Sequence, residues 1–321
     1  MVLMAMTIRK VKKVMPTLLL TGGSGLVGRN IQNHYASNKW NIIAPTSNDL
    51  NLMDYTAVKS FFDACKPDII LHCAGRVGGI SANIMEPVAF LDTNIIIGRN
   101  VIMGAREAKI KRLINLASTC IYPREAQNPL KEECILEGKL EPTNEGYAIA
   151  KIVALRLCQY IRKEDPSYNY KTLIPCNLYG RFDKFDPKKS HLLPAIIHKI
   201  HHAKITGKQS VEIWGDGSAR REFMYIEDLA DAIYFALESI SDIPDLMNLG
   251  VGNDYTVKEY YESVALAIGW QGEFVFDHSK PIGMAQKLSD ISLQSKWGWQ
   301  PKTKLKEGIK STYKYYLENV F

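Results

Sequence analysis

Several features of membrane, secreted and nucleic-acid-binding proteins are missing from this sequence. No apolar run reaches the roughly 18 residues that a membrane-spanning helix needs, so we expect no membrane partner. The six cysteines form no C-x-x-C pair, and in a chain of 321 residues we expect them to be reduced. No basic run is interleaved with aromatic residues, which argues against nucleic-acid binding. These absences favour a cytoplasmic protein.

The N-terminus lacks the features of a secretion signal. Basic residues interrupt the apolar run of residues 1–15 instead of preceding it, and no small-residue cleavage site follows. We therefore expect these residues to form an extension ahead of the fold. The composition, 46% hydrophobic and 23% charged, is that of a globular protein. The net charge of +6 is spread along the chain and favours, at most, an anionic ligand.

Short apolar runs alternate with amphipathic stretches through the first half of the chain. Strands are expected at 17–20, 40–44, 68–73, 112–117, 172–176, 223–226 and 247–249, and a strand followed by a turn at 207–217. Helices are expected to end near 36 and to span 55–65, 87–108, 147–162 and 226–238. This alternation predicts an α/β fold in which helices cover both faces of a doubly wound parallel sheet of the Rossmann type. We expect residues 1–180 and 225–250 to form this sheet domain. Residues 181–224 and 251–321, with helices and one short strand after Tyr255, would form a smaller C-terminal lobe.

A glycine-rich segment, TGGSGLVG, follows the first expected strand and opens a helix. Its glycines permit a tight turn, close approach to a pyrophosphate and packing of the helix on the strand. The helix N-terminus offers free N–H groups and a partial positive charge to the phosphates. A glycine triplet alone says little, but its place at the first strand–helix junction predicts a dinucleotide site. The predicted contacts are Gly22, Gly23, Ser24, Gly25, Leu26, Val27 and Gly28.

The end of the second expected strand bears on which dinucleotide binds. NAD sites usually place an acidic residue there to hold the ribose hydroxyls. Residues 44–48 read APTSN, with neither an acid nor an arginine for a 2′-phosphate. Thr46, Ser47 and Asn48 could donate hydrogen bonds to that phosphate, so we expect NADP(H).

A serine, a tyrosine and a lysine complete the predicted catalytic core. Tyr147 and Lys151 are four residues apart and share one face of a helix. A lysine cation near a phenol favours the phenolate and lowers its pKa. Ser118 ends the fourth strand and could donate a hydrogen bond to a substrate carbonyl, to which Tyr147 would give its proton as hydride arrives at carbon. A Y-x-x-x-K pattern also occurs by chance on amphipathic helices, but the upstream glycine loop favours the catalytic interpretation.

These residues resemble the extended short-chain dehydrogenase/reductases that act on nucleotide sugars. Finer motifs are similar to the GDP-L-fucose synthases, over nearly the whole chain from about Leu18. The motifs are VGGI at 77–80, STCIYP at 118–123, EPTNE at 141–145, PCNLYG at 175–180 and REF at 221–223.

The resemblance implies a GDP-linked 4-keto-6-deoxy sugar as substrate, whose carbons 3 and 5 are epimerised by Cys120 and His191 before NADPH reduces carbon 4. A ketone at carbon 4 acidifies the protons on carbons 3 and 5, and a thiol and an imidazole exchange protons near neutral pH. The implied GDP contacts are Lys199, Trp214 and Arg221. The further cofactor contacts implied are Ala74, Gly75, Leu116, Ala117, Lys151, Pro175, Asn177, Leu178 and His191.

Plainer interpretations remain for several of these residues. Cys120 could be a small packing residue, and His191 could cap the helix that follows it or bind the cofactor. The histidines at 191, 198, 201 and 202 have no acidic or cysteine partner at metal-site spacing, so we expect a solvated basic helix and no metal.

Two segments depart from the family pattern on the substrate side. Residues 180–185 read GRFDKF where the family typically has GPHDNF, and residues 280–283 read KPIG where it often has KPDG. An alternative therefore stays open, a carbon-4 reductase that does not epimerise and acts on a related sugar such as a heptose.

Rivals from other classes fit less well. A dehydratase or 4-epimerase is disfavoured because Thr119 and Cys120 occupy the place where dehydratases of this superfamily usually have an acidic pair. The intact Ser118, Tyr147 and Lys151 argue against a non-catalytic cofactor sensor. The long helices at 87–108 and 147–162 could pair across a two-fold axis, so we expect a homodimer.

Overall fold

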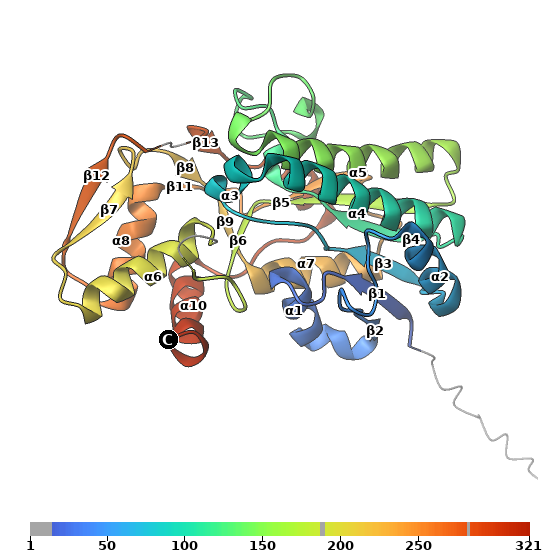
Figure 1. Cartoon of the computed structure of the whole chain (residues 1–321), viewed down its shortest axis with the longest axis horizontal. Helices are drawn as coiled ribbons and strands as arrows, with labels where there is room; N and C mark the ends of the chain where they lie inside the picture. The colour runs from blue at the N-terminus through green and yellow to red at the C-terminus, as the bar shows by residue number, and fades with distance from the viewer. Residues whose placement is uncertain (1–14, 187–189, 281–282) are drawn as a thin grey trace, which may run out of the picture.

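A six-stranded parallel sheet forms the centre of the computed structural model, which describes residues 15–186, 190–280 and 283–321 (Figure 1). The strand order is β10-β5-β4-β3-β1-β2. Its members are β1 (Thr17–Thr21), β2 (Asn41–Ile43), β3 (Ile69–His72), β4 (Arg112–Leu116), β5 (Asn169–Pro175) and β10 (Leu246–Leu249). This sheet confirms the predicted fold class. The expected N-terminal extension lies outside the described residues except for Met15.

Helices cover both faces of the sheet, as a doubly wound fold requires. One face carries α1 (Leu26–Asn33) and α7 (Ile226–Glu238), and the other carries α2 (Tyr55–Cys65), α4 (Pro87–Glu107) and α5 (Glu145–Glu164) (Figure 1). The helix expected to end near residue 36 ends at Asn33, because His34 has extended backbone and its side chain caps a following 3₁₀ helix at Tyr35–Lys39. Its imidazole accepts a hydrogen bond from Ala36 N at 3.3 Å.

Helix α4 is, within the described residues, the one helix long and apolar enough to cross a membrane by length and composition. The core helices of globular proteins meet the same test, and α4 packs against α2 and α5.

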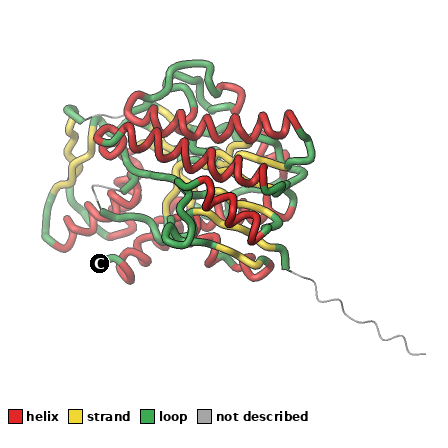
Figure 2. Tube along the Cα trace, turned by 45° about the vertical axis from the view of Figure 1, so that its right-hand side comes forward, coloured by secondary structure: helices red, strands yellow, loops and turns green. Residues whose placement is uncertain are grey.

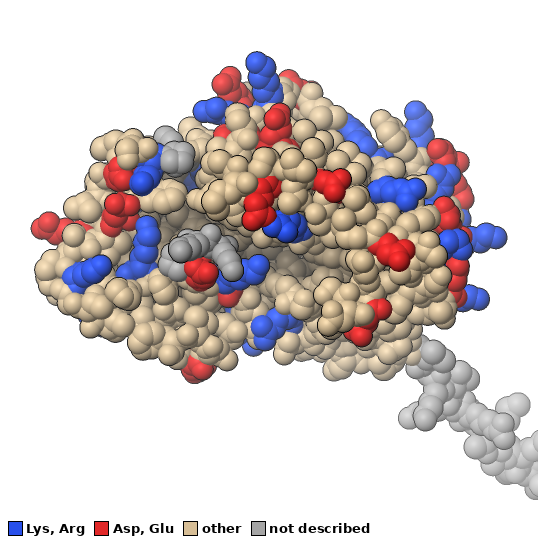
Figure 3. Space-filling model, viewed as in Figure 1, with Lys and Arg blue, Asp and Glu red and all other residues tan. Residues whose placement is uncertain are grey.

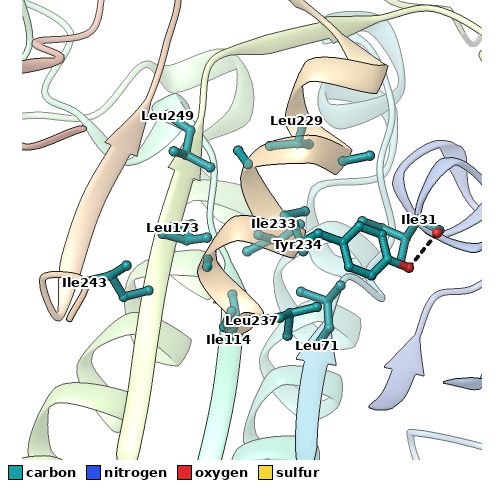
Figure 4. Close-up of a cluster of buried hydrophobic side chains, with 14 of the residues drawn as sticks. Ile31, Leu71, Ile114, Leu173, Leu229, Ile233, Tyr234, Leu237, Ile243 and Leu249 are labelled. Atoms are coloured by element: carbon teal, nitrogen blue, oxygen red, sulfur yellow. Dashed lines mark hydrogen bonds between the residues drawn. The ribbon is translucent and has the colours of Figure 1, made fainter. Parts of the chain in front are cut away.

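The core between α7 and the sheet is continuous and apolar (Figure 4). Leu229, Ile233 and Leu237 of α7 face Leu71, Ile114 and Leu173 of three neighbouring strands, and all six side chains are fully buried. At the edge of this layer the Tyr234 hydroxyl donates a hydrogen bond to Ile31 O at 2.8 Å, joining α7 to α1. Because the apolar residues of α7 are spaced four residues apart or less, they present one face to the sheet.

The remaining elements gather around a second apolar core beside the carboxyl edge of the sheet (Figures 1 and 2). They comprise α3 (Ile80–Met85), β6 (Asn177–Tyr179), α6 (Leu192–Ile205), β7 (Ser210–Trp214), β8 (Arg220–Arg221), β9 (Phe223–Tyr225), β11 (Tyr255–Thr256), α8 (Val257–Ile268), β12 (Glu273–Asp277), β13 (Gln286–Lys287), α9 (Ser292–Trp297) and α10 (Leu305–Asn319). Of these, α3, β8, β13 and α9 contribute no residue to that core, and α9 packs on β10.

In the described residues from Tyr255 onward there are three strands, not one, so that expectation was wrong. The strands β11 and β13 are two residues long and exist because they pair with β8 on either side, which leaves no local period to detect. The division into domains at residues 180, 224 and 250 stays a prediction.

A buried carboxylate joins the sheet to the smaller lobe. Glu222, between β8 and β9, is 1% exposed. Its carboxylate accepts hydrogen bonds from the backbone N–H groups of Val251 (2.6 Å), Gly252 (2.8 Å) and Ser289 (2.9 Å). These donors follow β10 and β13, so one side chain fixes three segments that are distant in sequence.

We expect Glu222→Ala to lower the free energy of unfolding by about 3 kcal/mol or more, because it leaves three buried N–H groups without acceptors. Urea unfolding followed by circular dichroism measures this loss. The matched control is Glu318→Ala, which removes an exposed ion pair with Lys314 and should change stability by less than about 0.5 kcal/mol. Equal stabilities of the two variants would contradict this account of Glu222.

Candidate active site

The glycine loop leaves no room for side chains at two of its positions. Gly22 has a φ of +75°, and a Cβ there would lie 2.7 Å from Ala74 N at the end of β3. A Cβ on Gly28 would lie 2.3 Å from Gly22 O. The loop is therefore pressed against the neighbouring strand end. Helix α1 begins directly after Gly25, with no side chain capping its first N–H groups and no acidic residue in its first turn. This geometry fits a dinucleotide pyrophosphate.

The other predicted cofactor contacts lie at the same edge of the sheet. Ala74 and Gly75 follow β3, and a Cβ on Gly75 would lie 3.8 Å from Lys151 Nζ. Since carboxyl ends of parallel strands meet at one edge, the contacts expected after β4 and β5 lie there too. These are Leu116, Ala117, Pro175, Asn177 and Leu178. Within this group, Asn177 Nδ2 donates to Glu222 O at 2.8 Å.

The end of β2 shows an interaction that the sequence did not reveal. Asp49 folds back so that its Oδ2 accepts hydrogen bonds from Thr46 N at 2.9 Å and Thr46 Oγ1 at 2.7 Å, which lowers the pKa of Asp49. Ser47 and Asn48 stay exposed. The hydroxyl of Thr46 is thus engaged by a carboxylate, whereas Ser47 and Asn48 remain as donors toward a 2′-phosphate.

The structure brings Ser118, Cys120, Tyr147 and Lys151 together. Ser118 and Cys120 belong to the turn after β4, and the Ser118 side chain is among the groups that lower the pKa of Cys120. From α5, Lys151 Nζ donates to Leu116 O at 2.9 Å and lies 5.7 Å from the centroid of the Tyr147 ring. The four side chains therefore occupy one wall where β4 meets α5.

Burial, and not Lys151, governs the Tyr147 hydroxyl in this structure. Removal from water raises the pKa of Tyr147, with Cys120 as a second cause. The same effect lowers the pKa of Lys151 and raises that of Cys120. The sequence-based expectation that Lys151 lowers the pKa of Tyr147 thus differs from the structure, because the ammonium is directed at the backbone of β4.

Asn94 is a supporting residue that the sequence analysis missed. Its amide donates to Arg76 O and Phe90 O and accepts from Arg76 N at 2.8 Å, so it holds the segment after β3 near Lys151. A buried asparagine within the apolar helix α4 was the available signal.

The surface is hollowed between the sheet domain and the smaller lobe, and lysine and arginine side chains line this hollow (Figure 3). Lys199 Nζ lies 5.8 Å and Lys280 Nζ 6.0 Å from the ring of Trp214, whose indole N–H donates to Glu212. Arg221 belongs to a different group, because β8 places it opposite Lys287 of β13. The residues of the departing segment at 281–282 lie outside the described residues.

His191 immediately precedes α6 but does not cap it with its side chain. The surrounding protein lowers the pKa of His191, and Lys184 adds to this effect. In the described part of the chain no hydrogen bond links His191 to Ser118, Cys120 or Tyr147. Two of the three histidines within α6 bond to tyrosines, His198 to Tyr316 and His201 to Tyr313. No group of three metal-binding side chains occurs within the residues described here.

Comparison with known proteins agrees with this geometry. Residues 18–250 match the model of the NAD dependent epimerase/dehydratase family. The chain belongs to this family. The match covers the glycine loop and the wall formed by Ser118, Cys120, Tyr147 and Lys151.

Relatives of this family member are similar over nearly the whole chain. It is 53% identical to a GDP-L-fucose synthase of Azorhizobium caulinodans, over 94% of this chain and 96% of that protein. It is 49% identical to a GDP-L-colitose synthase of Yersinia pseudotuberculosis, over 94% and 97%. Among solved structures, a GDP-6-OMe-4-keto-L-xylo-heptose reductase from Campylobacter jejuni superimposes with a TM-score of 0.89 at 32% identity, over 94% and 98%. A GDP-mannoheptose C4 reductase from the same organism, with NADP bound, gives 0.85 at 32% identity, over 94% and 98%.

We expect Tyr147→Phe to keep the fold and the affinity for NADPH but to lower kcat by about 10²-fold or more, because the proton donor is lost. Cofactor fluorescence and steady-state kinetics separate the two effects. Tyr160→Phe, which alters an exposed tyrosine on the same helix, is the control and should leave kcat unchanged. Full turnover by Tyr147→Phe would rule out Tyr147 as the donor.

Proposed function

We propose that this enzyme uses NADPH to reduce the 4-keto group of a GDP-linked 4-keto-6-deoxy sugar, after epimerising carbons 3 and 5. The observation that carries the proposal is the common wall of Ser118, Cys120, Tyr147 and Lys151 at the carboxyl edge of the sheet. It combines a proton donor for a ketone oxygen with a thiol able to exchange protons on the adjacent carbons. The names of the relatives support this substrate class.

The reduction assigns one role to each residue of this wall. Bound NADPH supplies the hydride to carbon 4. Ser118 Oγ donates a hydrogen bond to the carbonyl oxygen, and Tyr147 gives its proton to that oxygen as the negative charge develops. Lys151 holds the nicotinamide ribose and adds positive charge beside Tyr147.

Epimerisation uses protons that the ketone acidifies. Cys120 removes or returns a proton on one face of the carbon next to the carbonyl, and His191 acts from the opposite face. The lowered pKa of His191 leaves its imidazole neutral near pH 7, when it can accept a proton. His191 directly precedes α6 and makes no hydrogen bond to Cys120 in the described residues, so a bound sugar would have to bring the two groups to opposite sides of one carbon.

The cleft suits a nucleoside diphosphate. Lys199 and Lys280, which lie beside the exposed Trp214, supply positive charge for the phosphates, and the indole offers packing surface. Arg221, on the separate strand β8, would add positive charge from there. The exposed Ser47 and Asn48 support NADP(H) as the cofactor.

A second candidate is a carbon-4 reductase that does not epimerise. The solved structures named above include carbon-4 reductases of GDP-linked heptoses, and residues 180–185 depart from the fucose-synthase pattern close to His191. In this candidate Cys120 only packs against Ser118.

A panel of GDP-4-keto sugars, both 6-deoxyhexoses and heptoses, tests the reaction. We expect NADPH consumption with the 6-deoxyhexose and a lower kcat/KM with NADH. Lack of consumption with every sugar of the panel would sink the proposed function.

Heavy water separates the two candidates. In the wild type, deuterium should enter carbons 3 and 5 of the product, as seen by NMR. Cys120→Ser should slow this uptake by about 10²-fold or more, as expected for the loss of an acid–base group. Unchanged product stereochemistry in Cys120→Ser would favour the second candidate.

We propose that the protein is cytoplasmic and forms a homodimer. The exposed surface of α4 and α5 fits such a dimer. Less than half of the apolar window of α4 is buried within the chain, at 44%. Val88 on α4 and Tyr160 on α5 are exposed, at 76% and 59%. Pairing these two helices across a two-fold axis would remove this apolar surface from water.

Light scattering tests the assembly. We expect a mass of about twice 36.2 kDa for the wild type. A Val88→Asp, Tyr160→Asp double variant should dissociate, because it buries charge in the interface. Leu266→Asp, on the exposed face of α8, should remain dimeric. A monomeric wild type would refute the dimer.

A further inference from the structure

A lysine outside the Ser118–Tyr147–Lys151 core lies beside the reactive thiol. Strand β13 pairs in parallel with β8 and sets Lys287 opposite Arg221. The segment after it is anchored to the loop after β4, because Leu130 N donates to Leu288 O at 2.7 Å and Leu288 N donates to Asn128 Oδ1 at 2.8 Å. These bonds hold the segment after Lys287 against the loop of Asn128 and Leu130, and Leu130 packs in the same buried cluster as Cys120. Of the charges facing Cys120, that of Lys287 affects its pKa most.

A buried carboxylate, that of Glu141, interacts with Lys287 and Arg221. Glu141 is 6% exposed, and its Oε1 accepts hydrogen bonds from Thr143 N at 3.3 Å and Thr143 Oγ1 at 3.1 Å. Its Oε2 is buried and, among the residues that the structure describes, accepts no hydrogen bond, although Arg124 Nε lies 3.5 Å away. Both Lys287 and Arg221 interact electrostatically with this carboxylate. Three cations, Arg124, Lys287 and Arg221, therefore interact with this one carboxylate.

We propose that Lys287 and Glu141 are positioning residues that set the charge around Cys120. Lys287 stabilises the thiolate, and Glu141 offsets part of the positive charge of Lys287 and Arg221. The thiolate then takes a proton from the carbon next to the ketone, so that the C–H bond breaks, an S–H bond forms and the electron pair moves onto the carbonyl oxygen as an enolate. The proton-transfer step of this inference rests on the proposed function. The effect of Lys287 and Glu141 on the charge around the thiol does not depend on it.

The electrostatics of every neighbouring element support this assignment. Burial raises the pKa of Cys120, and three groups oppose the rise, namely Lys287 from β13, Ser118 from the same turn and Lys151 from α5. The Tyr147 hydroxyl also faces the thiol. Lys287 in turn has its pKa lowered by burial and by Arg221, and raised by Cys120 and Glu141. Without Lys287 the thiol would keep Lys151 as its one remaining cationic neighbour among the groups that affect its pKa.

The rate of alkylation of Cys120 by iodoacetamide measures its thiolate fraction in the intact enzyme. Trypsin releases residues 113–124, a peptide in which Cys120 is the only cysteine, so mass spectrometry follows this thiol alone. A nearby opposite charge shifts a pKa by about 1–3 units. At pH 8 we therefore expect Lys287→Met to slow alkylation about tenfold or more, and Glu141→Gln to accelerate it.

Matched variants separate charge from structure. Lys287→Arg restores a cation and should return the alkylation rate to within about threefold of the wild type, given the range of such shifts. Lys258→Met, on the exposed surface of α8, should leave it unchanged. Deuterium uptake at carbons 3 and 5 should fall with the alkylation rate in Lys287→Met.

Two results would overturn the inference. One is an alkylation rate that is equal in the wild type, Lys287→Met and Glu141→Gln, or a wild-type Cys120 that resists alkylation altogether. The other is a Lys287→Met enzyme with a raised KM but normal alkylation, which would make Lys287 a nucleotide-binding residue. Failure of the proposed function would instead appear as no turnover of any GDP-4-keto sugar while the alkylation rates still differ.

Discussion

The active site depends on the hydrogen bonds that buried polar side chains make where the sheet meets the smaller lobe. Glu222 ties β8 to the segments after β10 and β13. Asn248, fully buried on β10, accepts from the Tyr122 hydroxyl at 2.7 Å and donates to Leu130 O at 2.9 Å. A buried polar group without a hydrogen-bond partner raises the free energy of the folded state. The turn carrying Cys120 and the strand carrying Lys287 therefore have one favourable arrangement.

Burial of ionisable groups shapes the chemistry of the cleft. It raises the pKa of Tyr147 and Cys120, which favours their neutral forms, and it lowers the pKa of Lys151, Arg221 and Lys287 from their high ordinary values. The arrangement still places several cations around one thiol and one phenol. A substrate carrying two phosphates, and a ketone that becomes negative as it reacts, both gain from that charge.

Local patterns predicted much of the molecule. Helices α2 and α7 begin and end where their apolar spacing places them, since Asp54 caps the first and an apolar face repeats along the second. The glycine loop and the Tyr147–Lys151 pair were also readable, because each lies within one strand–helix unit. By contrast, β11 and β13 have no pattern of their own and exist through pairing with β8. Asn94 and Glu141 could not be identified from local patterns, because their roles depend on burial and on partners that are distant in sequence.

The sequence by itself determined the fold class, the dinucleotide loop and the residue types of the catalytic wall, because these depend on short-range spacing and on the alternation of strands with helices. Only the tertiary structure decided which charges meet. It turned Lys151 toward Leu116 and set Lys287 opposite Arg221, with Lys287 near enough to affect the pKa of Cys120. The physical reason is that electrostatic interactions act through space and grow as water is excluded, and neither distance nor burial is encoded in local spacing.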